Sequence, residues 1–385
     1  TNTYAGATSV TAVTLATVGN STLTATSSVG ISAGATLSLG GDEALEGIAN
    51  AGTITLGGIL TTGTTSYTLG GAIDGVGSLI KDGAGTLTLT SLTTHTGGTT
   101  VNAGNLLLSG AGDHLADAGS LTVNGGTFDL GTLAETVGTA TLTGGTIENG
   151  TLTATTFAFE AGTVSATLAG GSATKTTAGT LTLSGANTFV GGFTLGAGTA
   201  LAGDDAAFGI GTITLNGGVL SSTDANARAF ANALTLGGDA TLGATTNNGA
   251  LSFAGLTDLG ATTRTLTVAS AVGFDGVISG AAGLTKEGAG TLTFAAANTY
   301  AGATTVNAGT LVTAAGSLAA TASIDIGVAT LTAVDANAAA VLTVAAGGSA
   351  SFSGSTVAVA SLSGAGDVQL GATTFKVGAG NFSGV

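Results

Sequence analysis

"GAGTLTLTSLTTHTGGTTVNAGNLLLSG" (residues 83–110) is a phrase that this chain repeats. It returns as "GAGTLTFAAANTYAGATTVNAGTL" at 288–311 and, in a looser form, as "GTLTLSGANTFVGGFTLGAGTAL" at 179–201. The first ten residues, "TNTYAGATSV", match its second half alone. Self-similarity of this kind is typical of repeat architectures, in which each unit packs on its neighbours.

The composition predicts a folded chain with an acidic surface. Of 385 residues, 69 are glycine, 43% are hydrophobic and only 7% are charged, which is the reverse of the pattern that keeps chains disordered. The net charge of −15 comes from 21 acidic and 6 basic residues, so a surface that neutralises phosphates is excluded and nucleic acid is not an expected partner. The absence of cysteine excludes disulfides and thiolate metal sites.

No stretch of the sequence is long and apolar enough to suggest a transmembrane helix. Threonine and glycine interrupt every apolar run well before about 18 residues. We therefore expect no membrane-spanning segment in this chain.

Apolar residues alternate with threonine along much of the chain, as in "TITL" (53–56), "TLTLT" (86–90) and "TLTVAS" (265–270). A period of two predicts strands with one buried face, and threonine itself favours strands. The alanine-rich stretch 224–236 resembles a helix, but it has no cap and continues into a strand-like segment, so we expect strands there as well.

A second repeated plan shows how the strands are organised. Residues 36–58, 127–147 and 351–371 each read as a short strand, a turn, a second short strand, a corner of small residues and a third strand. Three strands in about twenty residues make one coil of a β-solenoid. The sequence thus predicts an all-β, right-handed parallel β-helix of about eighteen short coils, an elongated rod that forms one continuous domain over residues 1–385.

The inward side of each coil is expected to be apolar. Leu87, Leu89, Leu292 and Phe294 are among the predicted inward side chains. An array of antiparallel β-sandwiches is the alternative fold, but such domains carry large aromatic anchors, whereas here aromatic residues are 4% and tryptophan is absent.

The repeated phrase resembles the passenger-associated strand repeat of bacterial autotransporters. The copies lie near 79–108, 175–201 and 284–311, with a partial copy at 1–10. The third copy matches the family phrase at Lys286, Gly288, Gly290, Asn298, Tyr300, Val306 and Gly309. The first matches at Lys81, Gly83, Gly85, Val101 and Gly104, with Thr93 in place of the asparagine and His95 in place of the aromatic residue. The second keeps Gly179, Asn187, Phe189 and Gly198, but Ala178 stands in a degraded Gly-x-Gly.

This resemblance implies a β-helical passenger, secreted or displayed on a bacterial surface. The expected function is a non-catalytic structural or adhesive scaffold, with a host or neighbouring cell surface as partner and roles in aggregation or a biofilm matrix. Two alternatives are a segment or subunit of an end-to-end stacked filament, and the stalk of a secreted hydrolase. Because the chain opens inside one repeat phrase and ends just before another would begin, we also expect a portion of a longer array or copies that associate end to end.

Asp42, Glu43 and Glu46 form the densest acidic cluster. Carboxylates so grouped can bind Ca²⁺ or act as a general acid and base. The equivalent turns at 132–135 and 355–358 contain fewer acids, however. We therefore interpret the three acids as residues of an exposed turn, and a calcium site is the alternative. Similar turns occur at Asp113–Asp117 and at Asp204–Asp205.

The two histidines, His95 and His114, raise the question of a catalytic triad. Ser109 and Asp113 lie close to His114 in the sequence, but "SGAGDH" has no nucleophile elbow. His95 occupies the position of Tyr300 in the third copy, which predicts a packed turn residue. We expect no catalytic residue and no bound cofactor, apart from the calcium alternative.

Overall fold

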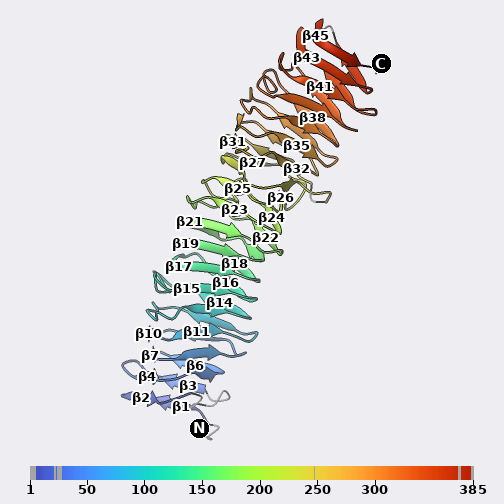
Figure 1. Ribbon diagram of the computed structural model, residues 1–385. Coiled ribbons are helices and arrows are strands. Elements are labelled where there is room, and N and C mark those ends of the chain that lie inside the picture. Colours follow the sequence, from blue (N-terminus) through green and yellow to red (C-terminus); the bar gives the residue numbers. More distant parts are fainter. Residues whose placement is uncertain (1–5, 21–22, 24–27, 247, 372–373, 383–385) are drawn as a thin grey trace. The chain divides into compact units, whose positions relative to one another are not determined.

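The computed structural model describes residues 6–20, 23, 28–246, 248–371 and 374–382. Over these residues the regular elements are all β-strands, and no α-helix is present. Within each part of the chain parallel strands stack as coils of a β-solenoid, about 19 turns in all, which confirms the predicted fold class (Figure 1). Residues 1–5 of the partial repeat copy lie outside the described part of the chain.

The chain divides into two compact units. Unit 1 comprises Thr1–Thr174 and Leu181–Gly191, and unit 2 comprises Lys175–Thr180 and Gly192–Val385. The expectation of one continuous domain over residues 1–385 stays a prediction.

The strands of unit 1 are short, with three to nine residues each. They are β1 (Thr8–Val10), β2 (Thr14–Thr17), β3 (Ser28–Ile31), β4 (Thr36–Leu39), β5 (Glu43–Leu45), β6 (Gly47–Asn50), β7 (Thr53–Leu56), β8 (Ile59–Thr62), β9 (Tyr67–Leu69), β10 (Ala72–Gly75), β11 (Ser78–Lys81), β12 (Thr86–Leu89), β13 (Thr99–Val101), β14 (Asn105–Leu108), β15 (Ser120–Val123), β16 (Thr127–Asp129), β17 (Ala134–Leu142), β18 (Thr146–Glu148), β19 (Thr151–Phe159) and β20 (Gly162–Val164). Two further strands, β21 (Thr167–Lys175) and β22 (Thr180–Leu183), contain residues of both units.

The strands of unit 2 are of similar length. They are β23 (Phe193–Leu195), β24 (Thr199–Ala202), β25 (Ile213–Leu215), β26 (Val219–Ser222), β27 (Arg228–Phe230), β28 (Leu234–Leu236), β29 (Ala240–Leu242), β30 (Leu251–Phe253), β31 (Thr257–Asp258), β32 (Arg264–Val268), β33 (Val272–Phe274), β34 (Ile278–Ser279), β35 (Leu284–Glu287), β36 (Thr291–Phe294), β37 (Thr304–Val306), β38 (Thr310–Thr313), β39 (Ser323–Ile326), β40 (Thr330–Ala333), β41 (Val341–Val344), β42 (Ser349–Phe352), β43 (Thr356–Gly364), β44 (Asp367–Leu370) and β45 (Thr374–Phe382). The helix-like stretch 224–236 thus forms β27 and β28, as predicted.

Each strand pairs in parallel with the strand at the same position in the next coil. In unit 1, for example, β12 pairs with β14, so that Leu87 faces Leu106. In unit 2, β36 pairs with β38, and Leu292 faces Leu311. The pairings between the described strands are parallel, which excludes the antiparallel sandwich for these coils.

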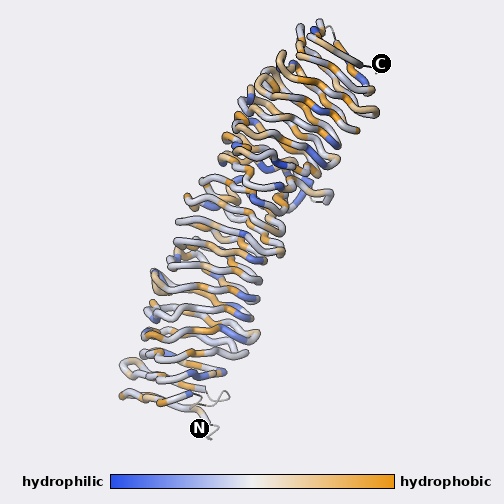
Figure 2. Tube along the Cα trace, in the orientation of Figure 1, coloured by the Kyte–Doolittle hydropathy of each residue, from blue (hydrophilic) through white to orange (hydrophobic). Residues whose placement is uncertain are grey.

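The alternation of apolar residues and threonine places the apolar set inside the coil. Leu87, Leu89, Leu292 and Phe294 are all fully buried, as the sequence predicted. The threonines between them are half-buried on the outer face, where neighbouring side chains of the same column cover them in part. Hydrophobic residues accordingly recur in coil after coil (Figure 2).

A column of aromatic rings fills part of the interior of unit 2. Neighbouring ring centroids are separated by 4.6 to 6.4 Å, within the range in which aromatic pairs attract. The column contains Phe193, Phe208, Phe230, Phe253, Phe274, Phe294 and Tyr300.

The expected three strands per coil are wrong in detail for residues 127–147 and 351–371. There the second and third strands merge into one nine-residue strand, β17 or β43. In β17 the inward positions change from 135 and 137 to 140 and 142, so the strand turns the corner at Gly138 without ending. A residue of small size at that point makes this bend possible.

Candidate functional site

The three predicted calcium ligands do not converge on one point. Asp42 Oδ1 accepts a hydrogen bond from the Ile59 amide at 2.9 Å, in the following coil. Glu46 Oε2 accepts bonds from the amide and the hydroxyl of Thr64 at 3.0 and 3.1 Å. Glu43 Oε2 accepts a bond from the Leu23 amide at 3.0 Å, in the preceding coil.

The expectation of an exposed turn is wrong for Glu43, whose side chain is only 2% exposed. It points into the coil and accepts a hydrogen bond from a backbone amide of the preceding coil. Asn187 and Asn298 do the same, since their Oδ1 atoms accept bonds from the amides of Leu168 and Ile278, each at 2.8 Å. Inward polar side chains in this solenoid therefore accept hydrogen bonds from main-chain amides of the preceding coil, where an unpaired amide would be costly.

Within the described residues, no group of three or more histidine, aspartate or glutamate side chains is arranged to hold a metal ion. Calcium at Asp42, Glu43 and Glu46 stays a prediction, and each of the three carboxylates already has a backbone amide as partner.

The loop between β14 and β15, residues 109–119, is held by a carboxylate from the next coil. Glu135 of β17 is fully buried, and its two oxygens accept bonds from the amides of His114 at 2.9 Å and Leu115 at 2.6 Å. This role of Glu135 was not predicted from the sequence. The signal that could have found it is its similarity to Glu43, because both are acids at the first inward position of a strand.

Asp113 lies against Glu135, and the two carboxyl groups affect one another. Burial raises the pKa of Glu135 to about 8, and its hydrogen bond with Asp113 adds to this, while the amides of His114 and Leu115 oppose it. The pKa of Asp113 is lowered, because bonds from Glu135, Asp117 and nearby amides outweigh its own burial. Asp113 Oδ1 is buried without another donor, so a proton shared with Glu135 would satisfy it.

The structure does not assemble the triad considered for Ser109, Asp113 and His114. The Nε2 atom of His114 lies 2.8 Å from the main-chain carbonyl oxygen of Ser109, and Nδ1 lies 3.0 Å from that of Gly112. The imidazole, fully buried, thus contacts main-chain oxygens where a triad would require a hydroxyl and a carboxylate.

His95 is a packed turn residue, as expected from its alignment. It is 2% exposed, and its Nε2 atom lies 3.1 Å from Thr99 Oγ1 and 3.2 Å from the Gly98 carbonyl oxygen. Burial lowers the pKa of His95, and the contact with Gly98 opposes this. Tyr300 has the equivalent contact, with its hydroxyl 2.6 Å from Thr304 Oγ1.

The lysine of each repeat copy is buried and surrounded by main-chain carbonyl oxygens. Lys81 Nζ donates to the carbonyls of Asp82, Gly83 and Ala103 at 2.8, 2.7 and 3.2 Å. The first two acceptors belong to its own turn, and the third belongs to the next coil, 22 residues further on. Its side chain is 1% exposed.

The other two copies have the same arrangement. Lys286 Nζ donates to Glu287, Gly288 and Ala308 at 3.4, 2.9 and 2.8 Å. Burial lowers the pKa of Lys286 to about 8, against an opposing effect of the Glu287 carboxylate. The carbonyl bonds favour the charged form of the ammonium, so they compensate part of the cost of its burial.

Lys175 was missed by the sequence analysis. It is fully buried, and its Nζ donates to the carbonyl of Thr177 and to that of Ala197, the latter at 3.4 Å. A signal for it does exist in the sequence. Each lysine precedes a glycine by 23 positions, and these glycines are Gly104, Gly198 and Gly309.

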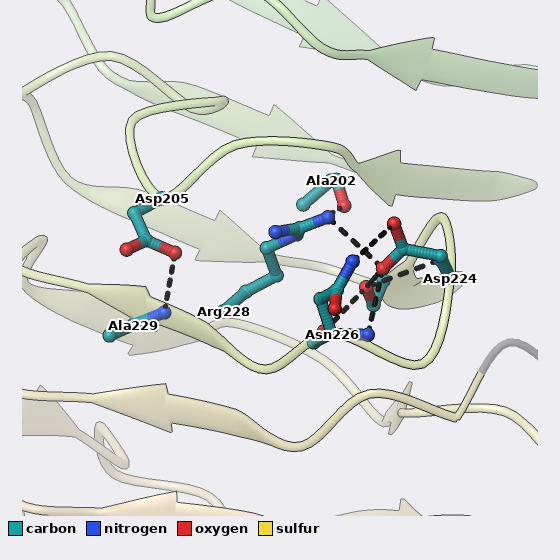
Figure 3. A network of polar contacts seen from close by, with 7 residues as sticks. Ala202, Asp205, Asp224, Asn226, Arg228 and Ala229 are labelled. Atoms are coloured by element: carbon teal, nitrogen blue, oxygen red, sulfur yellow. Dashed lines mark hydrogen bonds and ion pairs between the residues drawn. The ribbon is translucent and has the colours of Figure 1, made fainter.

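Unit 2 contains a second polar network, around Arg228 of β27 (Figure 3). One guanidinium nitrogen lies 3.1 Å from Asp224 Oδ1, and Nε donates to the Ala202 carbonyl at 3.1 Å. Asp224 also accepts the amide of Asn226 at 2.8 Å. The network closes the turn between β26 and β27 and ties it to the preceding coil.

The acidic pair at 204–205 has a structural role in the same region. Asp204 Oδ1 accepts the amide of Ala206 at 2.8 Å. Figure 3 shows the second contact, in which Asp205 Oδ1 accepts the amide of Ala229 at 3.0 Å. A cavity of about 270 Å³ adjoins Asp205 and is lined largely by small apolar residues. Its one carboxylate is therefore already engaged with a backbone amide.

The passenger-associated transport repeat family matches this chain at residues 79–108, 174–199 and 284–312. These three stretches contain the buried lysines, whose ammonium groups donate to main-chain carbonyl oxygens. Each such set of carbonyl acceptors is called a carbonyl site below. The chain is also 32% identical over 323 residues to the adhesin BmaC autotransporter of Brucella suis biovar 1 (strain 1330). That match covers 74% of this chain and 9% of the adhesin, so the chain spans a small part of the length of its relative. No solved structure matches the chain.

The fold, the three carbonyl sites and these comparisons lead to one conclusion. The chain is a β-solenoid that contains the passenger-associated transport repeat, and it resembles a segment of an autotransporter adhesin.

Proposed function

We propose that this chain is a stretch of an extracellular passenger, displayed on or released from a bacterial surface, that acts as an adhesive scaffold. The observation that carries the proposal is the similarity over 74% of the chain to an autotransporter adhesin, together with the three repeat copies. The stacked coils support it, because a solenoid presents long regular faces to a partner surface.

The distribution of charge suggests the chemistry of the surface that is bound. Three of the six basic residues are the buried lysines of the repeat, and Arg228 is paired with Asp224. Only Arg264 and Lys376 remain to balance the outward-facing acids. A strongly anionic scaffold favours cationic target surfaces, and such attraction weakens as salt screens it.

Adhesion can be tested with the purified chain immobilised on beads. Coated beads should bind more cells, or more cationic polymer, than uncoated beads do. The amount bound should be larger at low than at high salt. Equal retention by coated and uncoated beads would overturn the adhesive function. Retention that does not change with salt would leave adhesion standing and contradict only the cationic target.

The non-catalytic role belongs to the same proposal. The candidate catalytic groups have structural partners, since Glu43 accepts the Leu23 amide and His114 contacts main-chain oxygens. Turnover in protease, esterase or polysaccharide lyase assays that a point mutation abolishes would contradict it. The hydrolase-stalk alternative stays a prediction.

Self-association, filaments and biofilm formation also stay predictions. Electron microscopy of the purified chain is the measurement for the first two. Fibres that dissociate to chains of 35.7 kDa would support stacking, and a monodisperse monomer at high concentration would contradict it.

A further inference from the structure

We propose that the repeat lysines select the register in which one coil pairs with the next. Lys81, Lys175 and Lys286 each place a buried charge where the native register, and no other, provides its full set of acceptors. The inference concerns folding of the solenoid and is independent of what the chain binds.

The hydrophobic pattern by itself leaves the register open. In β35 and β37, inward and outward side chains alternate with a period of two. A slip of one residue would expose the inward set, but a slip of two residues keeps every side chain on its own face. Repeated Thr-Leu strands with small corner residues make such slipped pairings similar in energy to the native one.

The lysine distinguishes these pairings, because one of its acceptors belongs to the next coil. In the native register Lys286 pairs with Val306, and its Nζ reaches the carbonyl of Ala308 at 2.8 Å. A slip of two residues displaces that carbonyl by about 6.6 Å along the strand. The hydrogen bond would then be lost, since it needs a separation near 3 Å.

Burial makes this loss costly. The Lys286 side chain is 1% exposed, so water cannot replace the missing acceptor. An ammonium that loses a partner inside the protein is strongly unfavourable, whereas an apolar side chain of the same length would fit any register. A charge at this position therefore penalises the slipped pairings more than it stabilises the native one.

A glycine in the next coil also restricts the pairing to the native register. Gly104 and Gly198 have positive φ angles of 67° and 73°, and a Cβ at either would lie 2.7 Å from the Nζ of Lys81 or Lys175. The carbonyl site therefore has room for the lysine ammonium group only where the turn of the next coil has this glycine. Because lysine and glycine are always 23 positions apart, each lysine is matched to the turn of its own copy.

The register can be measured with pairs of cysteines, because the chain has none of its own. Thr285 and Thr305 face each other on the outer side of β35 and β37, so Thr285→Cys with Thr305→Cys reports the native register. Thr285→Cys with Ala303→Cys, or with Asn307→Cys, reports slips of two residues. Positions offset in this way are too far apart for a disulfide in the native register, because Cα atoms must lie within about 7 Å.

With Lys286 present, oxidation of the folded chain should yield the native crosslink and no slipped crosslink. In Lys286→Met the native crosslink should be partly lost and a slipped crosslink should appear. Lys376→Met is the matched control, because it removes one positive charge from an exposed position in β45, and it should leave the native crosslink unchanged.

The proposal is overturned if Lys286→Met retains the full native crosslink and forms no slipped one, even if the variant unfolds at lower denaturant. That result would assign the lysine to stability alone. The first copy provides a second test, with Lys81→Met and the facing pair Ile80→Cys and Thr100→Cys. If neither methionine variant folds, the lysines are a condition of stability and the proposal also fails.

Discussion

The hydroxyl oxygen of Tyr300 lies 2.6 Å from Oγ1 of Thr304, four residues later, and both side chains are buried. His95 and Thr99 form the corresponding polar pair in the first repeat copy. In the second copy both positions are phenylalanine. The two positions thus change together, because a buried polar group at one of them needs a partner at the other.

Thr304→Val should lower the free energy of unfolding by about 1–3 kcal/mol, because it removes one of the two threonine hydroxyls, those of Thr304 and Thr321, that contact the buried Tyr300 hydroxyl. The double variant Tyr300→Phe with Thr304→Val imitates the second copy. Its loss should be smaller than the sum of the two single losses, since no hydroxyl is then left unpaired. Urea unfolding of the four proteins measures the coupling, and strictly additive losses would contradict it.

Leu89→Ala and Leu292→Ala should each cost about 2–5 kcal/mol of stability, because each opens a cavity in a fully buried position. The loss should spread to adjacent coils, which share the same contacts. Thr88→Ala and Thr293→Ala, one residue away on the outer face, are the controls and should change stability little. Hydrogen exchange along the chain would locate the effect, and protection that stays unchanged next to the cavity would argue against coupling between coils.

Gly309→Ala should destabilise the protein more than Gly260→Ala. Both glycines have φ near +67° (66° and 68°), so alanine at either position pays the strain of a left-handed conformation, about 1–2 kcal/mol. At Gly309, however, a Cβ would also lie 2.5 Å from the Gly288 carbonyl oxygen, whereas at Gly260 it would meet nothing within 4 Å. Thermal unfolding of the two variants provides the comparison. Equal losses of stability would show that the carbonyl site of Lys286 has room for a side chain at position 309.

Glu135→Gln should remove a pH dependence of stability in unit 1. The pKa of Glu135 is raised to about 8 in the folded chain from an ordinary value of 4.5, so the folded state holds a proton that the unfolded state has released. This contribution is complete below about pH 4.5 and is lost as the pH rises through 8. Glutamine does not titrate, so this contribution no longer changes with pH, but its NH2 group cannot accept one of the two amides that Glu135 binds.

The sensitive measurement for this prediction is exchange of the His114 and Leu115 amides, which Glu135 binds. In the unaltered chain their protection should fall between pH 6 and 9 after correction for intrinsic exchange, and in Glu135→Gln it should not. Glu160→Gln, on a neighbouring coil, is a control for the removal of one carboxylate. A similar fall in all three proteins would show that Glu135 is not the responsible group.

The strand period, the small corner residues and the recurring phrase were sufficient to predict the β-solenoid, its inward residues such as Leu89 and Leu292, and the packed position of His95. These features are local, since a period of two and a turn residue act within a few positions of the chain. The carbonyl sites were predictable only in part. Lys81 and Lys286 stood out in the repeat, but nothing in the local pattern indicates that their ammonium groups are buried.

Only the tertiary structure decided which polar groups meet. Glu43 binds the Leu23 amide and Glu135 binds those of His114 and Leu115, each about twenty residues away. These distances depend on how many residues each coil contains: Leu87 faces a residue 19 positions on, whereas Arg228 faces one 23 positions on. Coil length varies with loops whose conformation the local sequence does not determine, so the partners of inward polar groups emerge only when the coils stack.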